Sequence, residues 1–352
     1  MKILILYGKD PSGIIAAYRA GQAPASFLYG LPFFTRFGIQ ADPFIPPRSR
    51  LANFLARFVR RFSREVASLL SLWRLPFVIR RYDALLLMNA DSVIGAVVVR
   101  SVVSPRTKIL FYNDRAERLV GRHRLKRWFY QYCDAIIPHS AYQSQFTKAV
   151  FDHATPWIHL GSDRNFFRPD GTPTENFVLS VGGDPGRDFG TLVAAAVRLP
   201  GIRFVLVGRE SKISGLAVPA NVTVHMNLPP TELRGLYRRA KLVAISLYPD
   251  DYDYGSEMPG AFFSGMTVLS DCIALGKAVV ASATQCVRDT LTNGTNAALV
   301  PPGDPTALAM AIRQIYQDDA HRAALGRNLA DLYDQYSIER TVEQFVRLLK
   351  SV

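Results

Sequence analysis

Short continuous apolar runs, separated by segments long enough for helices, constrain the fold of this chain more than any other feature. Nine such runs are present, each four to six residues long. Runs of this kind are typical of parallel strands whose sheet is covered by helices on both faces. They lie at residues 3–7, 84–88, 108–112 and 135–138 in the first half and at 177–181, 203–207, 222–225, 242–247 and 278–281 in the second. The sequence therefore predicts an α/β protein with a doubly wound, Rossmann-like sheet in each half.

A stretch rich in turn-forming residues separates the two groups of runs. Residues 161–173 read GSDRNFFRPDGTP, and 352 residues are enough for two domains that each bury a core. We expect a first domain over residues 1–165, a second over 166–335, and a C-terminal helix over 336–352 that packs back on the first domain. Helices near the end of the chain are expected at residues 306–318, 321–336 and 337–349.

The basic excess of the chain is confined to its first half. The formal net charge is +13, and residues 1–170 hold 25 Lys and Arg against 11 Asp and Glu, a charge of +14. Residues 171–352 hold 17 against 18, a charge of −1. This asymmetry predicts an anionic partner for the first domain only: nucleic acid, an acidic membrane face or a phosphorylated substrate. Since no recognised nucleic-acid motif is present, we expect no nucleic-acid partner.

Arginines and aromatic residues alternate over residues 48–81. Phe54, Phe58 and Phe62 recur at a spacing of four, which places them on one face of a helix. Such a helix is expected to lie in an anionic membrane interface; the alternative is an amphipathic helix that faces the core and exposes its arginines. The residues expected at the membrane are Arg57, Phe58, Arg60, Arg61, Phe62 and Arg64. A second basic cluster, residues 115–130, could extend the same surface.

Segments that would direct the protein through or across a membrane are not expected. No apolar run reaches the ~18 residues of a membrane span, and the apolar start is too short for a signal peptide. The three cysteines, Cys133, Cys272 and Cys286, are widely spaced and suit a reducing compartment. We therefore expect a cytoplasmic protein that is peripheral at the inner face of the cell membrane.

A glycine-rich turn follows the first apolar run of the second half. Residues 180–192 read SVGGDPGRDFGTL, with Gly182 and Gly183 directly after the expected strand. Glycines there let backbone N–H groups approach a phosphate at a helix N-terminus, and Arg187 adds a fork of donors. A tight strand-to-helix connection without a ligand is the alternative.

Further segments follow this turn in a characteristic order. They are residues 204–210, 221–225, 229–240, 264–281 and 293–305, and residues 133–140 and 160–169 precede it. As an ordered set they resemble the family 4 glycosyltransferases, over roughly residues 108–349. The resemblance implies the GT-B fold, in which two Rossmann-like domains face each other across a cleft and the second domain binds the sugar donor.

The resemblance also assigns donor-binding residues. It implies that Arg187 meets the donor diphosphate and that the turn before residue 268 presents backbone N–H groups to it. Asp271 stands where the family has the second of two glutamates, which holds the ribose, and Phe263 stands where it has the first. Glu257 could replace the missing acid or be a solvated loop residue. The expected donor-binding residues are Gly182, Gly183, Arg187, Arg209, Glu257, Ser264, Gly265, Met266, Thr267 and Asp271.

Candidate residues of the first half follow expected strands at their carboxyl ends, where open α/β sheets place ligands. On the acceptor side they are Lys9, Asp10, Ser12, Gly13 and His139. The expected catalytic residues are Asn113, Asp114 and Arg187. Asn113 and Asp114 could equally cap a helix, and His139 could be a structural core histidine.

An acidic loop at residues 249–257 contains an Asp-x-Asp sequence. In another class of glycosyltransferases such a pair holds a divalent metal, but its place in the second half argues against that class. We therefore expect neither a metal nor a cofactor.

Together these features predict a retaining, metal-independent glycosyltransferase. It would move a sugar from a nucleotide diphosphate donor to a lipid-linked or surface-polysaccharide acceptor at the membrane face, with cations and helix N-termini stabilising the leaving diphosphate. The alternatives are a sugar-nucleotide epimerase of the same fold and a non-catalytic relative that binds a nucleotide sugar.

Overall fold

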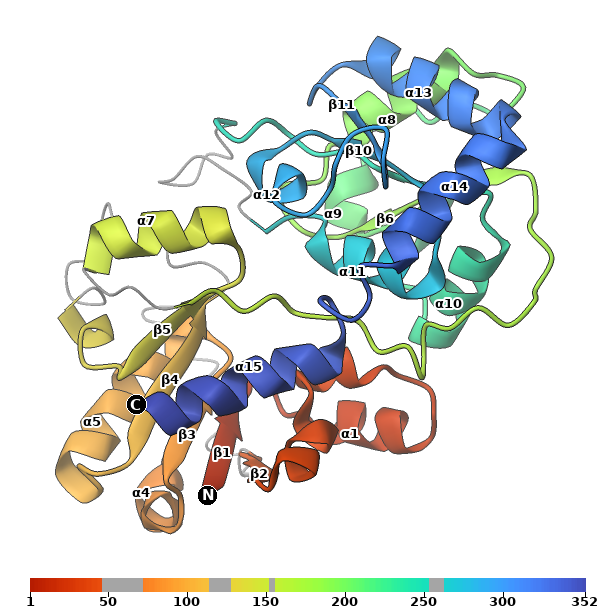
Figure 1. Cartoon of the computed structure of the whole chain (residues 1–352). Helices are drawn as coiled ribbons and strands as arrows, with labels where there is room; N and C mark the ends of the chain where they lie inside the picture. Colours follow the sequence, from red (N-terminus) through yellow and green to blue (C-terminus); the bar gives the residue numbers. More distant parts are fainter. Residues whose placement is uncertain (46–71, 114–127, 152–155, 253–262) are drawn as a thin grey trace. The chain divides into compact units, whose positions relative to one another are not determined.

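The chain folds into two compact units, each built on its own parallel sheet (Figure 1). The computed structural model describes residues 1–45, 72–113, 128–151, 156–252 and 263–352. The first unit comprises Met1–Arg19, Phe27–His159 and Thr341–Val352, and the second comprises Ala20–Ser26 and Leu160–Arg340. The sequence placed boundaries after residues 165 and 335, and it did not predict that Ala20–Ser26 would join the second unit.

The first unit contains a five-stranded sheet in the order β2-β1-β3-β4-β5, with every pair parallel. Its strands are β1 (Lys2–Leu6), β2 (Gln40–Pro43), β3 (Ala84–Leu87), β4 (Lys108–Asn113) and β5 (Ala135–Pro138). The strand order reverses between β1 and β3, and the crevice at their carboxyl ends is where open α/β sheets bind ligands.

Helices of the first unit come from segments far apart in the sequence. They are α1 (Ser12–Arg19), α4 (Leu75–Val78), α5 (Val93–Val103), α7 (Ala141–Phe151) and α15 (Ile338–Ser351), with 3₁₀ segments at Ala25–Leu28, Leu31–Phe37, Ile79–Arg81 and Ala90–Ser92. The buried Phe345 of α15 contacts the rings of Phe34 and Tyr112. Thr341 also donates its hydroxyl to the His159 carbonyl at 2.8 Å, so the last residues of the chain complete the core of this unit.

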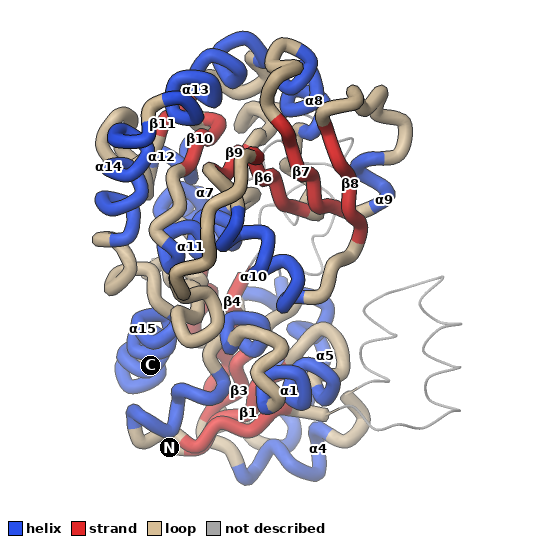
Figure 2. The backbone as a smooth tube through the Cα atoms, turned by 90° about the vertical axis from the view of Figure 1, so that its right-hand side faces the viewer, coloured by secondary structure: helices blue, strands red, loops and turns tan. Residues whose placement is uncertain are grey.

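The second unit contains a six-stranded parallel sheet in the order β11-β10-β9-β6-β7-β8 (Figure 2). Its strands are β6 (Phe177–Gly182), β7 (Arg203–Gly208), β8 (Val222–Met226), β9 (Leu242–Ile245), β10 (Val279–Ser282) and β11 (Ala298–Val300). Its helices are α8 (Phe189–Val197), α9 (Glu210–Ile213), α10 (Pro230–Arg239), α11 (Met266–Leu275), α12 (Gln285–Arg288), α13 (Pro305–Gln317) and α14 (Asp319–Ala330).

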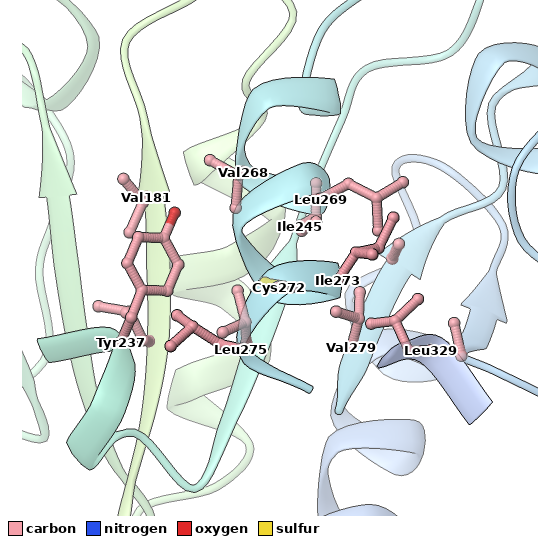
Figure 3. Close-up of a cluster of buried hydrophobic side chains, with 14 of the residues drawn as sticks. Val181, Tyr237, Ile245, Val268, Leu269, Cys272, Ile273, Leu275, Val279 and Leu329 are labelled. Atoms are coloured by element: carbon pink, nitrogen blue, oxygen red, sulfur yellow. The ribbon is translucent and has the colours of Figure 1, made fainter. Parts of the chain in front are cut away.

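Helix α11 is the central helix of the second unit. Nine of its ten residues are buried, which is expected of a helix that is apolar on all sides and packed between other elements. Figure 3 shows Leu269 and Ile273 of α11 toward Val279 of β10 and Leu329 of α14, and Val268 on the side of Val181 and Tyr237. The rigid surroundings of α11 fix the position of its N-terminus, where the candidate site begins.

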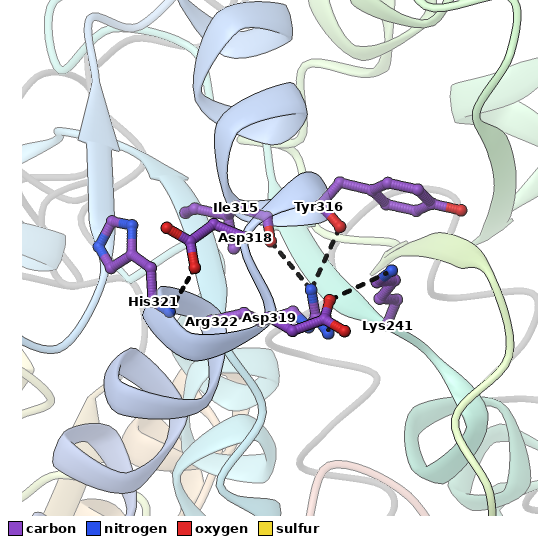
Figure 4. A network of polar contacts seen from close by, with 7 residues as sticks. All are labelled: Lys241, Ile315, Tyr316, Asp318, Asp319, His321 and Arg322. Carbon is purple, nitrogen blue, oxygen red and sulfur yellow. Dashed lines mark hydrogen bonds and ion pairs between the residues drawn. The ribbon is translucent and has the colours of Figure 1, made fainter.

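A polar network closes the corner between α13 and α14 (Figure 4). Asp318 caps α14 by accepting the His321 N–H at 2.8 Å. Arg322 donates to the carbonyls of Ile315 and Tyr316, at 3.1 and 3.2 Å, and thus satisfies the C-terminal end of α13. The first helix therefore ends at Gln317 and the second begins at Asp319, close to the ends predicted at residues 318 and 321.

The predicted α/β class and all nine predicted strands are confirmed, with bounds that differ by at most two residues. The sequence did not reveal two edge strands, β2 and β11: β2 (QADP) has no apolar run, and β11 (ALV) is only three residues long. The helix expected at residues 321–336 ends at Ala330, and the chain turns before α15.

Two buried histidines lie in the first unit. Burial lowers the pKa of His139 and of His159 to about 3, and for His139 the neighbouring His159 adds to the effect. Both are therefore neutral in the folded protein at neutral pH. In the unfolded chain each binds a proton as the pH falls below about 6.5.

This difference makes the first unit sensitive to acid. The stabilising contribution of each neutral histidine is present above pH 6.5 and is lost as the pH falls toward 3, by up to about 1.4 kcal/mol per pH unit. Urea unfolding at several pH values should show a smaller acid dependence for His139→Gln with His159→Gln than for the wild type. Parallel profiles for the two proteins would contradict this assignment.

Candidate functional site

The candidate site of the second unit lies where β6 and β7 end and α11 begins. Gly182 is the last residue of β6, Gly208 the last of β7, and the two pair across the sheet. The glycine-rich turn after β6 leads to Arg187, which forms an isolated bridge with Leu247 beyond β9. The local sequence thus gathers the predicted phosphate-binding turn at the carboxyl edge of the sheet, where ligands of such sheets bind.

Arg187 is the most deeply buried cation of this site, with 2% of its surface exposed. Its Nε donates to Asp184 Oδ2 at 2.9 Å. Its Nη1 is buried and has no hydrogen-bond partner among the described residues. A buried donor of a charged group is costly to leave unsatisfied, so this nitrogen points to an anionic ligand.

Asp184 holds the guanidinium in place. Burial alone would raise the pKa of the Asp184 carboxyl, but the charge of Arg187 and the hydroxyl of Ser264 outweigh it and keep the pKa below its usual range. The carboxylate is therefore ionised at neutral pH and links the turn after β6 to the residues before α11. Sequence reasoning missed Asp184, although it lies three residues before the arginine it pairs with.

Two glycines leave room for two arginines. A Cβ atom on Gly182 would overlap the Arg187 side chain, and one on Gly183 would lie 2.8 Å from Nε of Arg209. Arg209 follows β7 and is exposed. Both guanidinium groups thus lie directly against the backbone of the turn, which requires glycine at both positions.

The N-terminus of α11 has no side-chain cap. Its N-cap Gly265 has a φ of 82°, in the left-handed region, and packs against Ile245 and Leu247. Ser264 and Met266 are buried beside it, whereas Thr267 is exposed in the first turn. Free backbone N–H groups at the positive end of a helix favour an anion.

Asp271 lies deeper in α11 than its predicted role requires. It is 6% exposed, and its Oδ1 accepts the Ser162 hydroxyl at 2.9 Å. Burial raises the pKa of this carboxyl to about 8, with Ser162 opposing and Asp163 adding to the rise. The predicted ribose-binding acid is thus largely protonated at neutral pH and is bonded to the segment that enters the second unit.

Comparison with protein families decides the identity of this unit. Residues 163–331 match the family model described as glycosyl transferases group 1. Over these residues the chain is similar to the group 1 glycosyl transferases. The recognition of a glycosyltransferase from the sequence is confirmed at the level of family.

Two curated relatives match part of the chain and carry the same name. One from Corynebacterium urealyticum, named D-inositol 3-phosphate glycosyltransferase, is 32% identical over 124 residues, 35% of this chain and 26% of the relative. One of the same name from Corynebacterium kroppenstedtii is 30% identical over 109 residues, 31% of this chain and 21% of the relative. The matches thus span about a quarter of the length of these relatives.

Solved structures resemble the whole chain. The Anabaena protein HepE, solved in complex with UDP-glucose, aligns over 100% of both chains with a TM-score of 0.70 and 16% identity. Sucrose-phosphate synthase from Thermosynechococcus elongatus aligns over 100% of this chain and 98% of its own, with a TM-score of 0.68 and 17% identity. These likenesses confirm the predicted GT-B fold of two Rossmann-like domains.

The acceptor-side candidates lie in the first unit at the carboxyl ends of its strands. Lys9, Asp10, Ser12 and Gly13 follow β1, and Asp10 Oδ1 accepts both the N–H and the hydroxyl of Ser12, at 2.9 and 2.6 Å. Asp10 is therefore used at the start of α1. His139 follows β5, is buried, and stacks on Tyr112 with ring centroids 3.8 Å apart.

Several predicted residues cannot be placed. Asn113 ends β4, but only its backbone is described. Asp114, Glu257 and the predicted membrane residues Arg57, Phe58, Arg60, Arg61, Phe62 and Arg64 lie outside the described residues. In the acidic loop, the Asp250 carboxylate accepts the Gln285 N–H at 2.9 Å. This carboxylate therefore bonds the first residue of α12. Within the described part of the chain, no cluster of metal-binding side chains occurs.

Asn89 is a first-unit candidate that sequence reasoning missed. It follows β3, and its Oδ1 accepts the N–H and hydroxyl of Ser92, both at 3.0 Å. Its Nδ2 is buried without a partner among the described residues, and Gly8, which follows β1, lies against it. This unpaired donor lies at the point where the strand order reverses. The sequence could have indicated Asn89, because it is the polar residue directly after the apolar run at residues 84–88.

Two carboxyls of the second unit, the buried Asp271 and the half-buried Asp184, should respond to pH in opposite ways. Because the pKa of Asp271 is raised from 3.8 to about 8, its stabilising contribution is present below pH 3.8 and is lost as the pH rises toward 8. Asp271→Asn keeps an acceptor for Ser162 and should gain stability over the wild type across that range, by up to about 1.4 kcal/mol per pH unit.

Asp184→Asn is the matched control. The pKa of Asp184 is lowered, so its contribution is present above pH 3.8 and is lost only in stronger acid. This variant should lose about 1–3 kcal/mol at pH 7, because a buried guanidinium is left without its anion. Unfolding by urea at pH 5, 7 and 8.5 measures both; a loss of stability in Asp271→Asn at pH 8.5 would contradict the raised pKa.

Proposed function

We propose that the protein is a retaining, metal-independent glycosyltransferase that moves a sugar from a nucleotide diphosphate donor to an acceptor. The observation that carries this proposal is the buried, unpaired Nη1 of Arg187 beside the uncapped N-terminus of α11. The family of residues 163–331 and the fold of the whole chain support the same reaction class.

In this proposal the second unit holds the donor diphosphate. Arg187 and the backbone of Gly182 and Gly183 meet the phosphates, Arg209 adds a second guanidinium, and Ser264 to Thr267 present the helix N-terminus. Charge that develops on the leaving diphosphate is stabilised by donors fixed before the reaction begins. In other enzymes one such donor contributes about 10²–10³-fold to the rate, so this site needs no catalytic metal or carboxylate pair.

The nucleobase of the donor is also proposed rather than known. One structurally similar protein, HepE, was solved with UDP-glucose, which makes UDP the first ligand to test.

The first unit is proposed to bind the acceptor. Its sequence carries the whole basic excess, so we propose a lipid-linked or surface-polysaccharide acceptor with anionic groups, met by a cytoplasmic protein peripheral at the inner membrane face. The curated relatives are named for an acceptor that carries a phosphate, which supports an anionic acceptor. Asn89 and His139 are its candidate contacts at the carboxyl edge of the sheet, with Lys9, Asp10, Ser12 and Gly13, and Asn113 and Asp114 remain the proposed catalytic residues of this half.

A non-catalytic donor-binding protein is the second candidate. Phe263, which packs on the buried cluster around α11, stands where the resemblance expects an acidic residue. Slow hydrolysis of a bound nucleotide sugar would exclude this candidate. Conversion of the nucleotide sugar without any acceptor would instead favour an epimerase.

The donor proposal predicts that UDP raises the melting temperature of the protein, because a ligand of the folded state stabilises it. Arg209→Ala should weaken UDP binding about tenfold, since one charged hydrogen bond contributes about 1.5–3 kcal/mol. Arg203→Ala is the matched control, because Arg203 is exposed at the opposite end of the same strand and should leave binding unchanged. Equal effects of the two substitutions in isothermal titration would refute the role of Arg209.

Gly182→Ala should weaken UDP binding by displacing Arg187. The added methyl overlaps Arg187, which is buried and has no room to move aside, so the guanidinium must leave its place. UDP affinity should fall at least about tenfold, consistent with the loss of a charged hydrogen bond. Gly201→Ala is the control, since its Cβ would meet nothing within 4 Å. Unchanged affinity in a folded Gly182→Ala protein would remove Arg187 from the site.

A further inference from the structure

Three segments of the first unit expose large apolar side chains. Phe77 of α4 is 74% exposed, Val102 of α5 is 78% exposed, and Trp128 is 51% exposed. Trp73, Val98 and Tyr132 are also exposed. Single exposed apolar residues are common on protein surfaces, but a contiguous group of aromatic residues marks an interaction site.

These segments pack together into one surface. α4 lies beside α5 (Figure 1), and Arg80, just after α4, donates to the Val103 carbonyl at 3.0 Å. One turn earlier in α5, Arg100 donates to the Tyr132 carbonyl at 2.5 Å. Within the segments, the rings of Trp73 and Phe77 meet edge to face, as do those of Trp128 and Tyr132. Val98 and Val102 are four residues apart and share one face of α5.

The same segments carry only positive charge. Residues 72–81, 93–106 and 128–133 contain five arginines and no aspartate or glutamate. The guanidinium of Arg74 lies over the Trp73 ring, 5.3 Å from its centroid. We call this surface the aromatic-arginine face, and it consists of Trp73, Arg74, Phe77, Arg80, Arg81, Val98, Arg100, Val102, Arg106, Trp128 and Tyr132.

We propose that the aromatic-arginine face docks on an anionic lipid bilayer. Tryptophan and tyrosine partition to the membrane interface, where an apolar ring and a polar edge are both accommodated. Exposed aliphatic side chains gain by entering the acyl boundary, and arginines are attracted by anionic headgroups. The proposal names a surface made of described residues, in addition to the segment predicted from sequence.

Charge argues against a second copy of the chain as the occupant. Two identical faces would bring arginines against arginines with no acid from either side, and such like-charge contacts are unfavourable. A bilayer supplies negative charge and an apolar layer over the whole face at once. The choice of a lipid surface agrees with the proposed function, but docking and donor binding are measured separately, so either can fail alone.

Flotation of the full chain with vesicles tests the proposal. The protein should float with phosphatidylcholine vesicles that contain phosphatidylglycerol, and binding should fall in high salt or without the anionic lipid. Phe77→Ser with Val102→Ser should reduce binding about tenfold. The control is Val197→Ser with Met310→Ser, two residues of the second unit that are 57% and 66% exposed. Equal binding by both double variants would overturn the proposal.

Charge reversal tests the arginines of the face against a matched control pair. Arg74→Glu with Arg81→Glu should abolish binding to anionic vesicles, whereas Arg288→Glu with Arg327→Glu, which makes the same charge change in the second unit, should leave it in place. If both pairs reduce binding equally, the attraction is a property of net charge and the face is not the docking surface. The thermal shift with UDP should be the same in all these variants, which separates this outcome from failure of the donor site.

Tryptophan fluorescence locates the contact. Trp73 and Trp128 are two of the three tryptophans of the chain. Brominated lipid in the anionic vesicles should quench wild-type emission but not that of Trp73→Phe with Trp128→Phe, in which Trp157 remains. Quenching that persists in this variant would overturn the proposal, as would a dimer in light scattering that Phe77→Ser with Val102→Ser dissociates.

Discussion

Parallel pairing of the described strands is the constraint on which the rest of the molecule depends. In a parallel sheet all strands end at the same edge, so the residues that follow them meet there even when they are far apart in the sequence. In the second unit this brings together the turn after β6, Arg209 after β7 and Leu247 after β9. In the first unit it brings Gly8, Asn89 and His139 to the corresponding edge.

The second unit manages its buried charges differently on the two sides of α11. At the N-terminal side, an arginine and an ionised aspartate compensate each other and leave one guanidinium nitrogen for a ligand. In the middle of the helix, the buried Asp271 carboxyl avoids an unpaired charge by remaining protonated, and it accepts the Ser162 hydroxyl. Burying a charge without a partner is unfavourable, so a site that keeps a cation buried is prepared for an anion in advance.

The sequence predicted the central strands and the glycine-rich turn after β6 because both depend on local patterns. An apolar run is visible residue by residue, and so is a pair of glycines before an arginine. The edge strands β2 and β11 were missed because β2 has no apolar run and β11 is only three residues long. Asp184, Asn89 and the Ser162 bond to Asp271 were missed for a related reason. Their partners or surroundings are fixed only once the backbone brings them together, and the depth of Asp271 in α11 has no signature in its sequence neighbours.

The division of the chain has a consequence for its synthesis. The first unit contains the first residues of the chain, yet its core is completed by Phe345 and its neighbours in α15, which leave the ribosome after the whole second unit. Domains that are continuous in sequence fold in order as they emerge. Here the unit that begins first must finish last, so its apolar core stays partly uncovered while the second unit folds ahead of it.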